Sequence, residues 1–193
     1  MVTSLPDVSE LPLLDDAGWR AWFVDAARRV IRWTAATGVA VFFQSDVRRR
    51  GVWIDKGHLV ARAADDEGAV LLWHVIVCRQ PPGTVSFGRP GYGHMICVAP
   101  RAIPARPPGP DVLADGGATT WSKGIGLEAC RLACRFVRDE IGSRVVVDPF
   151  CGRGTVPAVA NALGLDAIGV EIAQKRCRAA RALQVTLDPS GAR

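Results

Sequence analysis

The segment Val145–Thr155, with the sequence VVVDPFCGRGT, constrains the fold more than any other feature of the chain. An apolar strand ends in Asp148, a glycine-rich turn follows, and a helix begins near Thr155. Glycines let a backbone approach a ligand closely, and the N–H groups of the first helical turn then face that ligand. A second apolar strand (DAIGV) ends in Glu171, whose carboxylate can accept hydrogen bonds from a ribose diol. This is the nucleotide-site arrangement of a doubly wound α/β sheet.

The glycine pattern by itself fits several nucleotide cofactors. The third glycine of the dinucleotide fingerprint is absent, because the chain reads GRGTVPA from Gly152. There is also no Gly-Lys-Ser/Thr sequence, which excludes a P-loop. An oxidoreductase that uses a dinucleotide therefore stays a weaker alternative.

Strands and helices are predicted to alternate along the whole chain. Hydrophobic periodicity predicts strands at 39–43, 70–78, 94–99, 144–147 and 166–172, and helices at 16–37, 56–64, 127–141, 156–163 and 173–183. The basic residues 47–51 are expected to form a loop. Alternation of this kind predicts a doubly wound, mainly parallel α/β sheet of the Rossmann-like type.

The chain of 193 residues has the length of one domain. Its one clear break in composition is the Pro- and Gly-rich stretch 102–118. We therefore expect a single domain over 1–193, with a first half at 1–101, a linker at 102–118 and a second half at 119–193.

Composition excludes some classes of protein. Hydrophobic residues make up 49% of the chain, which is too many for overall disorder. No apolar run reaches the about 18 residues that a membrane span needs, and the first residues do not resemble a secretory signal. The six cysteines show no zinc spacing, so we expect no metal and a cytoplasmic, reduced protein. The net charge of +5, carried mostly by arginine, permits a nucleic-acid partner.

The sequence VVVDPFCGRGTVPAVANALGLDAIGVEI resembles the segment that binds S-adenosylmethionine (SAM) in amino-group DNA methyltransferases and related RNA methyltransferases. The resemblance implies a seven-stranded methyltransferase sheet, with SAM as the cofactor. In most such enzymes the cofactor motif opens the domain, whereas here it lies near the C-terminus. The chain therefore resembles the class of circularly permuted order, with the catalytic half first.

The resemblance also implies which residues bind SAM. In the permuted class a Thr/Ser–Lys segment precedes the cofactor strand, and TTWSKG occupies that place here. The cofactor-binding residues implied are Trp121, Ser122, Lys123, Asp148, Pro149, Phe150, Cys151, Gly152, Gly154, Thr155, Glu171 and Ile172.

The catalytic motif of the permuted class is a polar residue followed by Pro-Pro and an aromatic residue, at the end of the first strand. The chain reads Ser4-Leu5-Pro6-Asp7 at that place. The resemblance implies that Ser4 and the Pro6 carbonyl accept hydrogen bonds from the target amine. The chain departs from the motif where Leu5 replaces the first proline and Asp7 replaces the aromatic residue. A carboxylate at position 7 could instead accept a proton or an N–H group from the target. A similar Asn-Leu-Pro variant occurs in tRNA guanine-N1 methyltransferases, which modify a ring nitrogen.

Loops after the strands of the first half should share one edge of the sheet and contact the substrate. Arginines beside aromatic residues suit phosphate contact and base stacking. The candidates are Asp46, Arg48, Arg49, Arg50, Lys56, Arg79, Phe87, Arg89 and Tyr92.

No segment is large enough for the target-recognition insertion that DNA enzymes of this class usually carry. The sequence therefore favours a structured tRNA or rRNA as substrate. The alternatives are DNA, a protein or a small molecule, or a non-catalytic subunit that binds SAM or RNA. A homodimer is also permitted.

Overall fold

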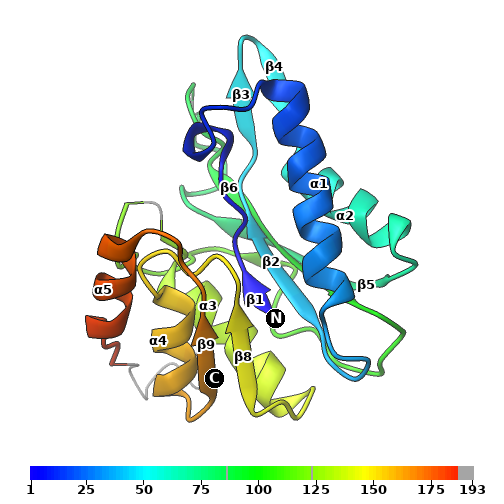
Figure 1. Ribbon diagram of the computed structural model, residues 1–193, viewed down its shortest axis with the longest axis vertical. Coiled ribbons are helices and arrows are strands. Elements are labelled where there is room, and N and C mark those ends of the chain that lie inside the picture. The colour runs from blue at the N-terminus through cyan, green and yellow to red at the C-terminus, as the bar shows by residue number, and fades with distance from the viewer. Residues whose placement is uncertain (86, 123, 187–193) are drawn as a thin grey trace.

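The computed structural model describes residues 1–85, 87–122 and 124–186 (Figure 1). The main sheet has the strand order β1 (Val2–Thr3), β2 (Ala40–Gln44), β6 (Tyr92–Ala99), β5 (Val70–Cys78) and β7 (Val112–Leu113). β1 is parallel to β2, whereas β6 is antiparallel to both of its neighbours. The sheet is therefore more mixed than the sequence predicted, because the consecutive strands β5 and β6 pair with each other as antiparallel neighbours.

The glycine-rich segment follows a second pair of strands. β8 (Val145–Asp148) is parallel to β9 (Asp166–Gly169). β8 lies beside β1, where the Thr3 hydroxyl donates a hydrogen bond of 2.6 Å to Asp148 Oδ1. The first strand of the chain therefore lies next to the strand that carries the glycine turn, and both end at the same edge. The circular permutation itself stays a prediction.

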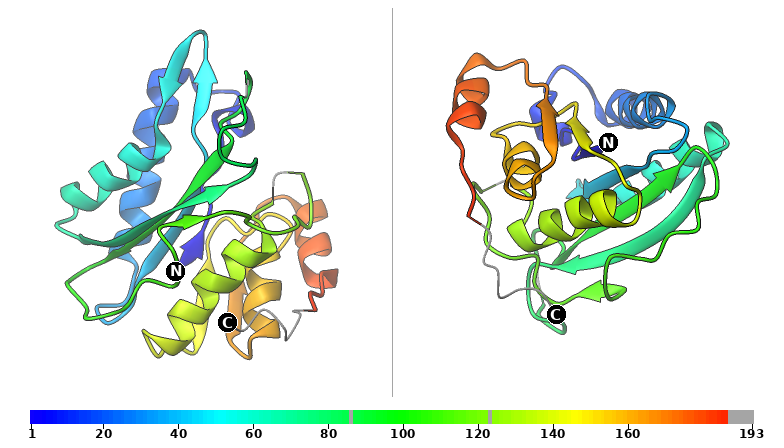
Figure 2. Two further views of the ribbon diagram at one scale, coloured as in Figure 1. Left: turned by 180° about the vertical axis from the view of Figure 1, so that it is seen from behind. Right: turned by 90° about the horizontal axis from the view of Figure 1, so that it is seen from below.

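Helices cover both faces of the sheet (Figure 2). One face packs on α1 (Asp16–Arg32) and α2 (Lys56–Asp66), and the other packs on α3 (Leu127–Asp139) and α4 (Thr155–Ala162). α5 (Gln174–Ala182) contacts α4. Each face of the sheet has its own hydrophobic core: the first lies under α1 and α2, and the second lies under α3 and α4. Because side chains alternate along a strand, Phe42 belongs to the first core and Phe43 to the second. Both halves of the chain share the second core, where Trp73 packs edge to face on Phe136 at 5.1 Å.

Three local predictions were wrong. Residues 47–54 form a hairpin of β3 (Val47–Arg49) and β4 (Val52–Ile54), because Arg50 and Gly51 both adopt positive φ angles, of 49° and 81°. The predicted linker contains β7, which pairs with β5. α1 ends at Arg32 and is capped by Trp33, short of the predicted end.

Among the described residues, no helix has the length and apolar character to span a membrane. All six cysteines are free thiols.

Candidate active site

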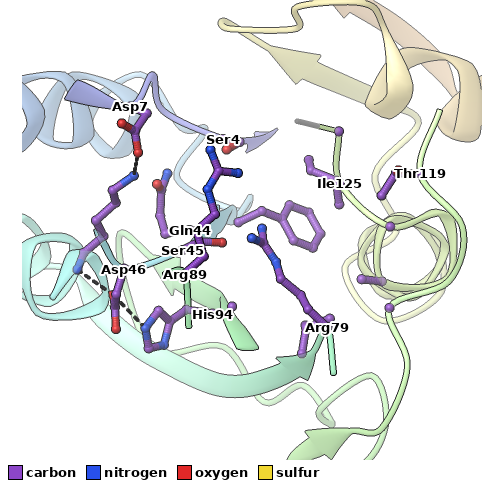
Figure 3. A pocket seen from close by; sticks show the side chains of 18 of the residues that line it. Ser4, Asp7, Gln44, Ser45, Asp46, Arg79, Arg89, His94, Thr119 and Ile125 are labelled. Carbon is purple, nitrogen blue, oxygen red and sulfur yellow. Dashed lines mark hydrogen bonds and ion pairs between the residues drawn. The ribbon is translucent and has the colours of Figure 1, made fainter. Parts of the chain in front are cut away.

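A cavity of about 550 Å³ opens at the carboxyl ends of β1, β2 and β5 (Figure 3). Its walls come from segments far apart in the sequence. They include Ser4, Leu5, Asp7, Gln44, Ser45, Asp46, Lys56, Arg79, Arg89, His94, Thr119, Ser122 and Ile125. The cavity therefore brings Ser4 and Asp7 together with Ser122, one of the residues that the sequence assigned to SAM, whereas Trp121 and residues 148–155 and 171–172 are not among its lining residues.

The Asp7 carboxylate caps a short 3-10 helix, η1 (Val8–Glu10), and pairs with Lys56. Its Oδ1 accepts from the Ser9 amide at 3.0 Å, and its Oδ2 lies 2.8 Å from Lys56 Nζ. Burial opposes ionisation of Asp7, but the charge and hydrogen bond of Lys56 outweigh it, so the pKa of Asp7 lies below its usual range. A carboxylate held in this way is a weak base. The geometry favours a positioning role for Asp7 over the proton acceptor that the sequence suggested.

Lys56 is a buried lysine at the start of α2. Its side chain is 4% exposed, and its ammonium group lies 5.6 Å from the centroid of the Trp19 ring. Because Asp7 is its ion-pair partner, Lys56 holds η1 against α2 and so fixes the path of the chain after Ser4. Ser4 lines the cavity, whereas Pro6 is not among the lining residues.

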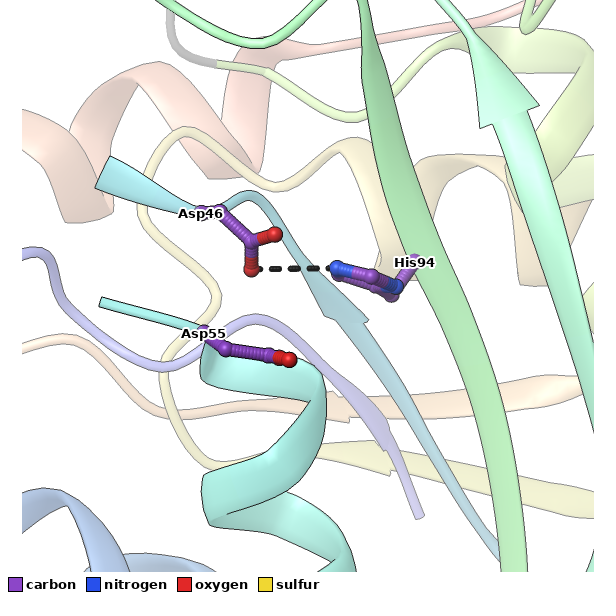
Figure 4. Close-up of side chains that lie close together, drawn as sticks. All are labelled: Asp46, Asp55 and His94. Carbon is purple, nitrogen blue, oxygen red and sulfur yellow. Dashed lines mark hydrogen bonds and ion pairs between the residues drawn. The ribbon is translucent and has the colours of Figure 1, made fainter. Parts of the chain in front are cut away.

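Asp46 is the centre of a hydrogen-bond network on the cavity wall. Its Oδ1 accepts from the Lys56 amide at 2.9 Å and bonds His94 Nε2 at 3.0 Å (Figure 4). Its Oδ2 accepts from the Tyr92 hydroxyl at 3.4 Å. His94 Nδ1 in turn bonds His74 Nε2 at 2.9 Å. The predicted substrate residues Asp46 and Tyr92 therefore bond each other.

The pKa of Asp46 reflects these partners. Burial raises this pKa, but hydrogen bonds from His94, the Lys56 amide and Trp53 lower it by a larger amount, so the net shift is downward. Burial and the neighbouring His94 also lower the pKa of His74. For a histidine this shift favours the neutral form, whereas for Asp46 it favours the charged form. Asp46 therefore remains ionised and acts as an acceptor for fixed donors.

Two arginines predicted to contact substrate enter the cavity. The side chains of Arg79 and Arg89 both point into it, as Figure 3 shows. Burial, and then the charge of Arg89, lower the pKa of Arg79. Two guanidinium groups near each other favour an anionic group between them.

The other predicted substrate residues are not among those that line this cavity. Arg48 and Arg49 lie on β3, and Arg49 is 3.2 Å from Asp16 in a half-buried ion pair. Arg50 lies in the turn of the β3–β4 hairpin. Phe87 is 92% exposed in the loop between β5 and β6.

Asp148 is buried at the start of the glycine turn. Its Oδ1 accepts from the Thr3 hydroxyl and, at 3.1 Å, from the Phe150 amide. Burial raises the pKa of Asp148 to about 7, although these two hydrogen bonds act against that shift. The carboxyl group therefore ties the turn to β1 rather than facing solvent.

The two glycines of the turn have different roles. Gly152 has a φ of 54°, and a Cβ there would meet only Trp121 Cζ2, at 3.4 Å. Gly154 has a φ of 87°, and a Cβ there would lie 2.7 Å from the Cβ of Ala180 in α5. Gly152 therefore leaves an open approach to the backbone, as a ligand needs, whereas Gly154 also permits close helix packing.

The residues before α3 lie on this turn. The Thr120 and Thr155 hydroxyls are 2.7 Å apart, and the Arg153 guanidinium lies 5.4 Å from the Trp121 ring centroid. Ser122 lines the cavity. Lys123 lies outside the described residues.

The end of β9 completes the predicted cofactor region. Glu171 Oε1 accepts from the Ala173 amide at 2.7 Å, and the Cys151 amide donates to the Val170 carbonyl at 3.0 Å, which joins the turn to this strand end. Ile172 is fully exposed beside Glu171. An acceptor for ribose hydroxyls next to an exposed apolar side chain fits the adenosine part of SAM. The aromatic ring of Phe150, by contrast, packs on Trp22 at 6.2 Å, and Pro149 lies between it and Asp148.

Among the cavity residues that sequence reasoning missed, Gln44 and His94 are buried and polar. Gln44 is 4% exposed on the cavity wall, and its Nε2 has no hydrogen-bond partner among the described residues. His94 is opposite Gln44 in the β2–β6 ladder. Both are polar residues at the end of an apolar strand where a ligand site is expected, and this signal could have found them.

Residues 140–182 match the model of the DNA methylase family of N6- and N4-methyltransferases. No curated protein matches the sequence.

Solved structures match nearly the whole chain. TTHA0409 of Thermus thermophilus, a proposed DNA modification methylase in complex with SAM, shares 19% identity at a TM-score of 0.72, over 97% of this chain and 90% of that one. PvuII DNA methyltransferase, which is specific for cytosine N4, shares 16% identity at a TM-score of 0.73, over 98% and 81%. M1.HpyAVI in complex with SAM shares 14% identity at a TM-score of 0.63, over 93% and 85%. At these identities the likeness shows the fold.

The family match and the fold together identify a SAM-dependent methyltransferase, with SAM as the cofactor. The match of residues 140–182 to the N6- and N4-methyltransferases confirms the resemblance to this family that the sequence indicated. When bound, SAM supplies an activated methyl group on a sulfonium leaving group.

Proposed function

We propose that the chain methylates an exocyclic amino group of a base in DNA. The single observation that carries this proposal is the hydrogen bond between Thr3 and Asp148, which holds the end of β1 beside the cofactor turn. Ser4, which follows β1, lines the cavity that also contains the predicted substrate residues Asp46, Arg79 and Arg89. The match of residues 140–182 to DNA methylases favours DNA over the RNA substrate that the sequence suggested.

The chain's own groups suit a base that carries an amino group. The Ser4 hydroxyl can accept an N–H of the amine and so direct its lone pair toward the methyl group. The buried Gln44 Nε2 can donate to a ring nitrogen or carbonyl beside that amine, which would satisfy an N–H group that is costly to leave unpaired. In the transfer, the N–C bond forms as the S–C bond breaks, and the amine then loses one proton to water.

The Ser4–Asp7 motif departs from the family at its aromatic position, which Asp7 occupies. Phe43 is the aromatic residue that lines the cavity among the described residues. It comes from β2, next to β1 in the sheet. We propose that its ring packs against the target base in place of the missing aromatic residue.

The test is methyl transfer from labelled SAM to DNA, with RNA and protein extract in parallel, followed by mass spectrometry of the nucleosides. Label on cytosine N4 or adenine N6 of DNA supports the proposal. Label confined to RNA or protein would overturn the DNA assignment. SAM binding without label in any pool would favour a non-catalytic subunit.

Variants connect the activity to the site. Ser4→Ala should lower kcat by about tenfold and leave SAM affinity unchanged, since one hydrogen bond to the amine is lost. Gly152→Leu should weaken SAM binding by about 100-fold, because a side chain would fill the approach to the turn. Gly164→Leu is the matched control: Gly164 also has a positive φ, of 77°, but lies in open space after α4. Equal SAM affinity in the two leucine variants would remove Gly152 from the cofactor site.

A further inference from the structure

A second cavity, of about 360 Å³, lies beside the first. It is enclosed by the β3–β4 hairpin and the loop between β5 and β6. The two cavities share Cys78, Gln80 and Arg89 as lining residues, so they are contiguous along the end of β5. A chain-like substrate with one unit in the first cavity can therefore continue into the second.

The linings of the two cavities differ in chemistry. The first contains four carboxylates, from Asp7, Glu10, Asp46 and Asp115. Among the described residues the second is lined by no carboxylate; it has two guanidinium groups and three aromatic rings, from Arg48, Arg89, Trp53, Phe87 and Tyr92. Cations combined with aromatic rings, and without acidic residues, fit a base and its phosphate.

The β3–β4 hairpin presents a ring and a cation together. Arg48 and Trp53 are directly opposite each other in the ladder, so their side chains share one face of the hairpin. Trp53 is 47% exposed, which leaves much of a large apolar ring in contact with water. The hairpin projects beyond the main sheet at the top of Figure 1.

Tyr92, which also lines the second cavity, is held in place by the Asp46 network. The Tyr92 hydroxyl donates to Asp46, and the Tyr92 ring packs edge to face on His94 with a centroid distance of 5.5 Å. One buried carboxylate in the first cavity therefore orients a ring that lines the second.

We propose that the second cavity binds the base of the nucleotide next to the methylated one, by stacking between Trp53 and Tyr92, with the linking phosphate at Arg89. The inference rests on the proposed function and specifies its substrate: an extruded or unpaired stretch of strand, rather than a single flipped base. The stacking selects for the presence of a base and tolerates any sequence, because every base has a π-face.

The test compares the binding of fluorescein-labelled single-stranded oligonucleotides by anisotropy, in the presence of S-adenosylhomocysteine. Each oligonucleotide carries one target base, with its neighbours either intact or replaced on one side by an abasic site. In the wild-type protein, the abasic site on one side should weaken binding by about tenfold. The Trp53→Ala variant should bind the intact oligonucleotide about tenfold more weakly than the wild type does. In this variant the abasic site should reduce the affinity only slightly further.

Two further variants control for folding and for loss of an indole elsewhere. Trp33→Ala removes a tryptophan that is 64% exposed at the end of α1, at the opposite edge of the sheet, and should keep the full abasic effect. Trp53→Phe should also keep most of it, since a ring remains. An abasic effect of the same size in wild type and Trp53→Ala would overturn the inference, as would the absence of any oligonucleotide binding.

This experiment separates the two proposals. Binding is measured without methyl transfer, so the two results are independent. An abasic effect of the expected size with no labelled DNA would contradict the proposed function and support the second cavity as a nucleotide site. Labelled DNA with no abasic effect would support the proposed function and contradict the nucleotide site.

Discussion

The two halves of the chain bury a carboxylate in opposite ways. Asp46, in the first half, is 2% exposed and has a lowered pKa; Asp148, in the second, is 3% exposed and has a pKa raised to about 7. Burial penalises the charge of both. Asp46 gains donors from His94, Tyr92 and the Lys56 amide, whereas Asp148 has the Thr3 hydroxyl and the Phe150 amide.

The difference shows that burial alone does not set the charge of an acid. Donors from several elements outweigh the loss of water around Asp46, so its negative charge organises the substrate side of the site. The two neutral donors of Asp148 do not outweigh the loss of water around its carboxylate. The predicted cofactor side therefore contains an acid that titrates near neutral pH. Three changes test this contrast.

At constant pH, the largest effect on the free energy of unfolding is expected for Asp46→Ala. The variant leaves His94, the Tyr92 hydroxyl and the Lys56 amide without an acceptor, and unpaired buried donors are costly. We expect the free energy of unfolding in urea to fall by about 3 kcal/mol. Asp25→Ala, which breaks the exposed Arg29 pair on α1, is the control and should change it by less than about 0.5 kcal/mol. A loss for Asp46→Ala no larger than that of the control would contradict the role of Asp46 as a hub.

Asp148→Asn should change the pH dependence of stability. Because the folded-state pKa of about 7 lies above the ordinary value of 3.8, the folded protein binds this proton more tightly than the unfolded chain does. The stability linked to the proton is present below pH 4 and is lost as the pH rises through 7. As the pH rises between these limits, the free energy of unfolding of the wild type should fall by about 2–4 kcal/mol relative to that of the asparagine variant. Parallel stability–pH curves for the two proteins, measured by urea titration, would refute the raised pKa; Asp166→Asn, at an exposed position of β9, should follow the wild type.

The smallest effect is expected for the pair Asp7 and Lys56. In a double-mutant cycle of Asp7→Asn and Lys56→Met, we expect a coupling of about 1–2 kcal/mol in the free energy of unfolding, because the ammonium group is buried and the carboxylate is partly exposed. Asp7 has a lowered pKa, so its contribution is present above pH 4 and is lost as the pH falls through the folded-state pKa.

The same variants decide between two roles of Asp7. A positioning carboxylate predicts that Asp7→Asn keeps most of kcat and the pH–rate profile. A profile that loses its acidic limb together with more than about 100-fold of kcat would show Asp7 to be a base.

Much of the fold could be predicted because local pattern and tertiary structure agree. β5 has the predicted bounds, and the ends of α2 to α5 lie within about two residues of prediction, because apolar periodicity and capping act locally. The β3–β4 hairpin was missed because its arginines suggested a solvated loop, while its turn depends on two left-handed residues. β7 was missed because two residues gain strand geometry only by pairing with β5.

The sequence by itself determined the cofactor turn of this protein. Glycines, an apolar strand and an acidic strand end lie within a short stretch of chain, so their spacing is read directly. The substrate side was decided by the tertiary structure. Asp46, between β2 and β3, acquires its role through contacts with His94 and Tyr92 of β6, and Lys56 becomes the partner of Asp7 because the start of α2 lies beside η1. Charge, burial and donor count at those positions depend on neighbours that no local pattern specifies.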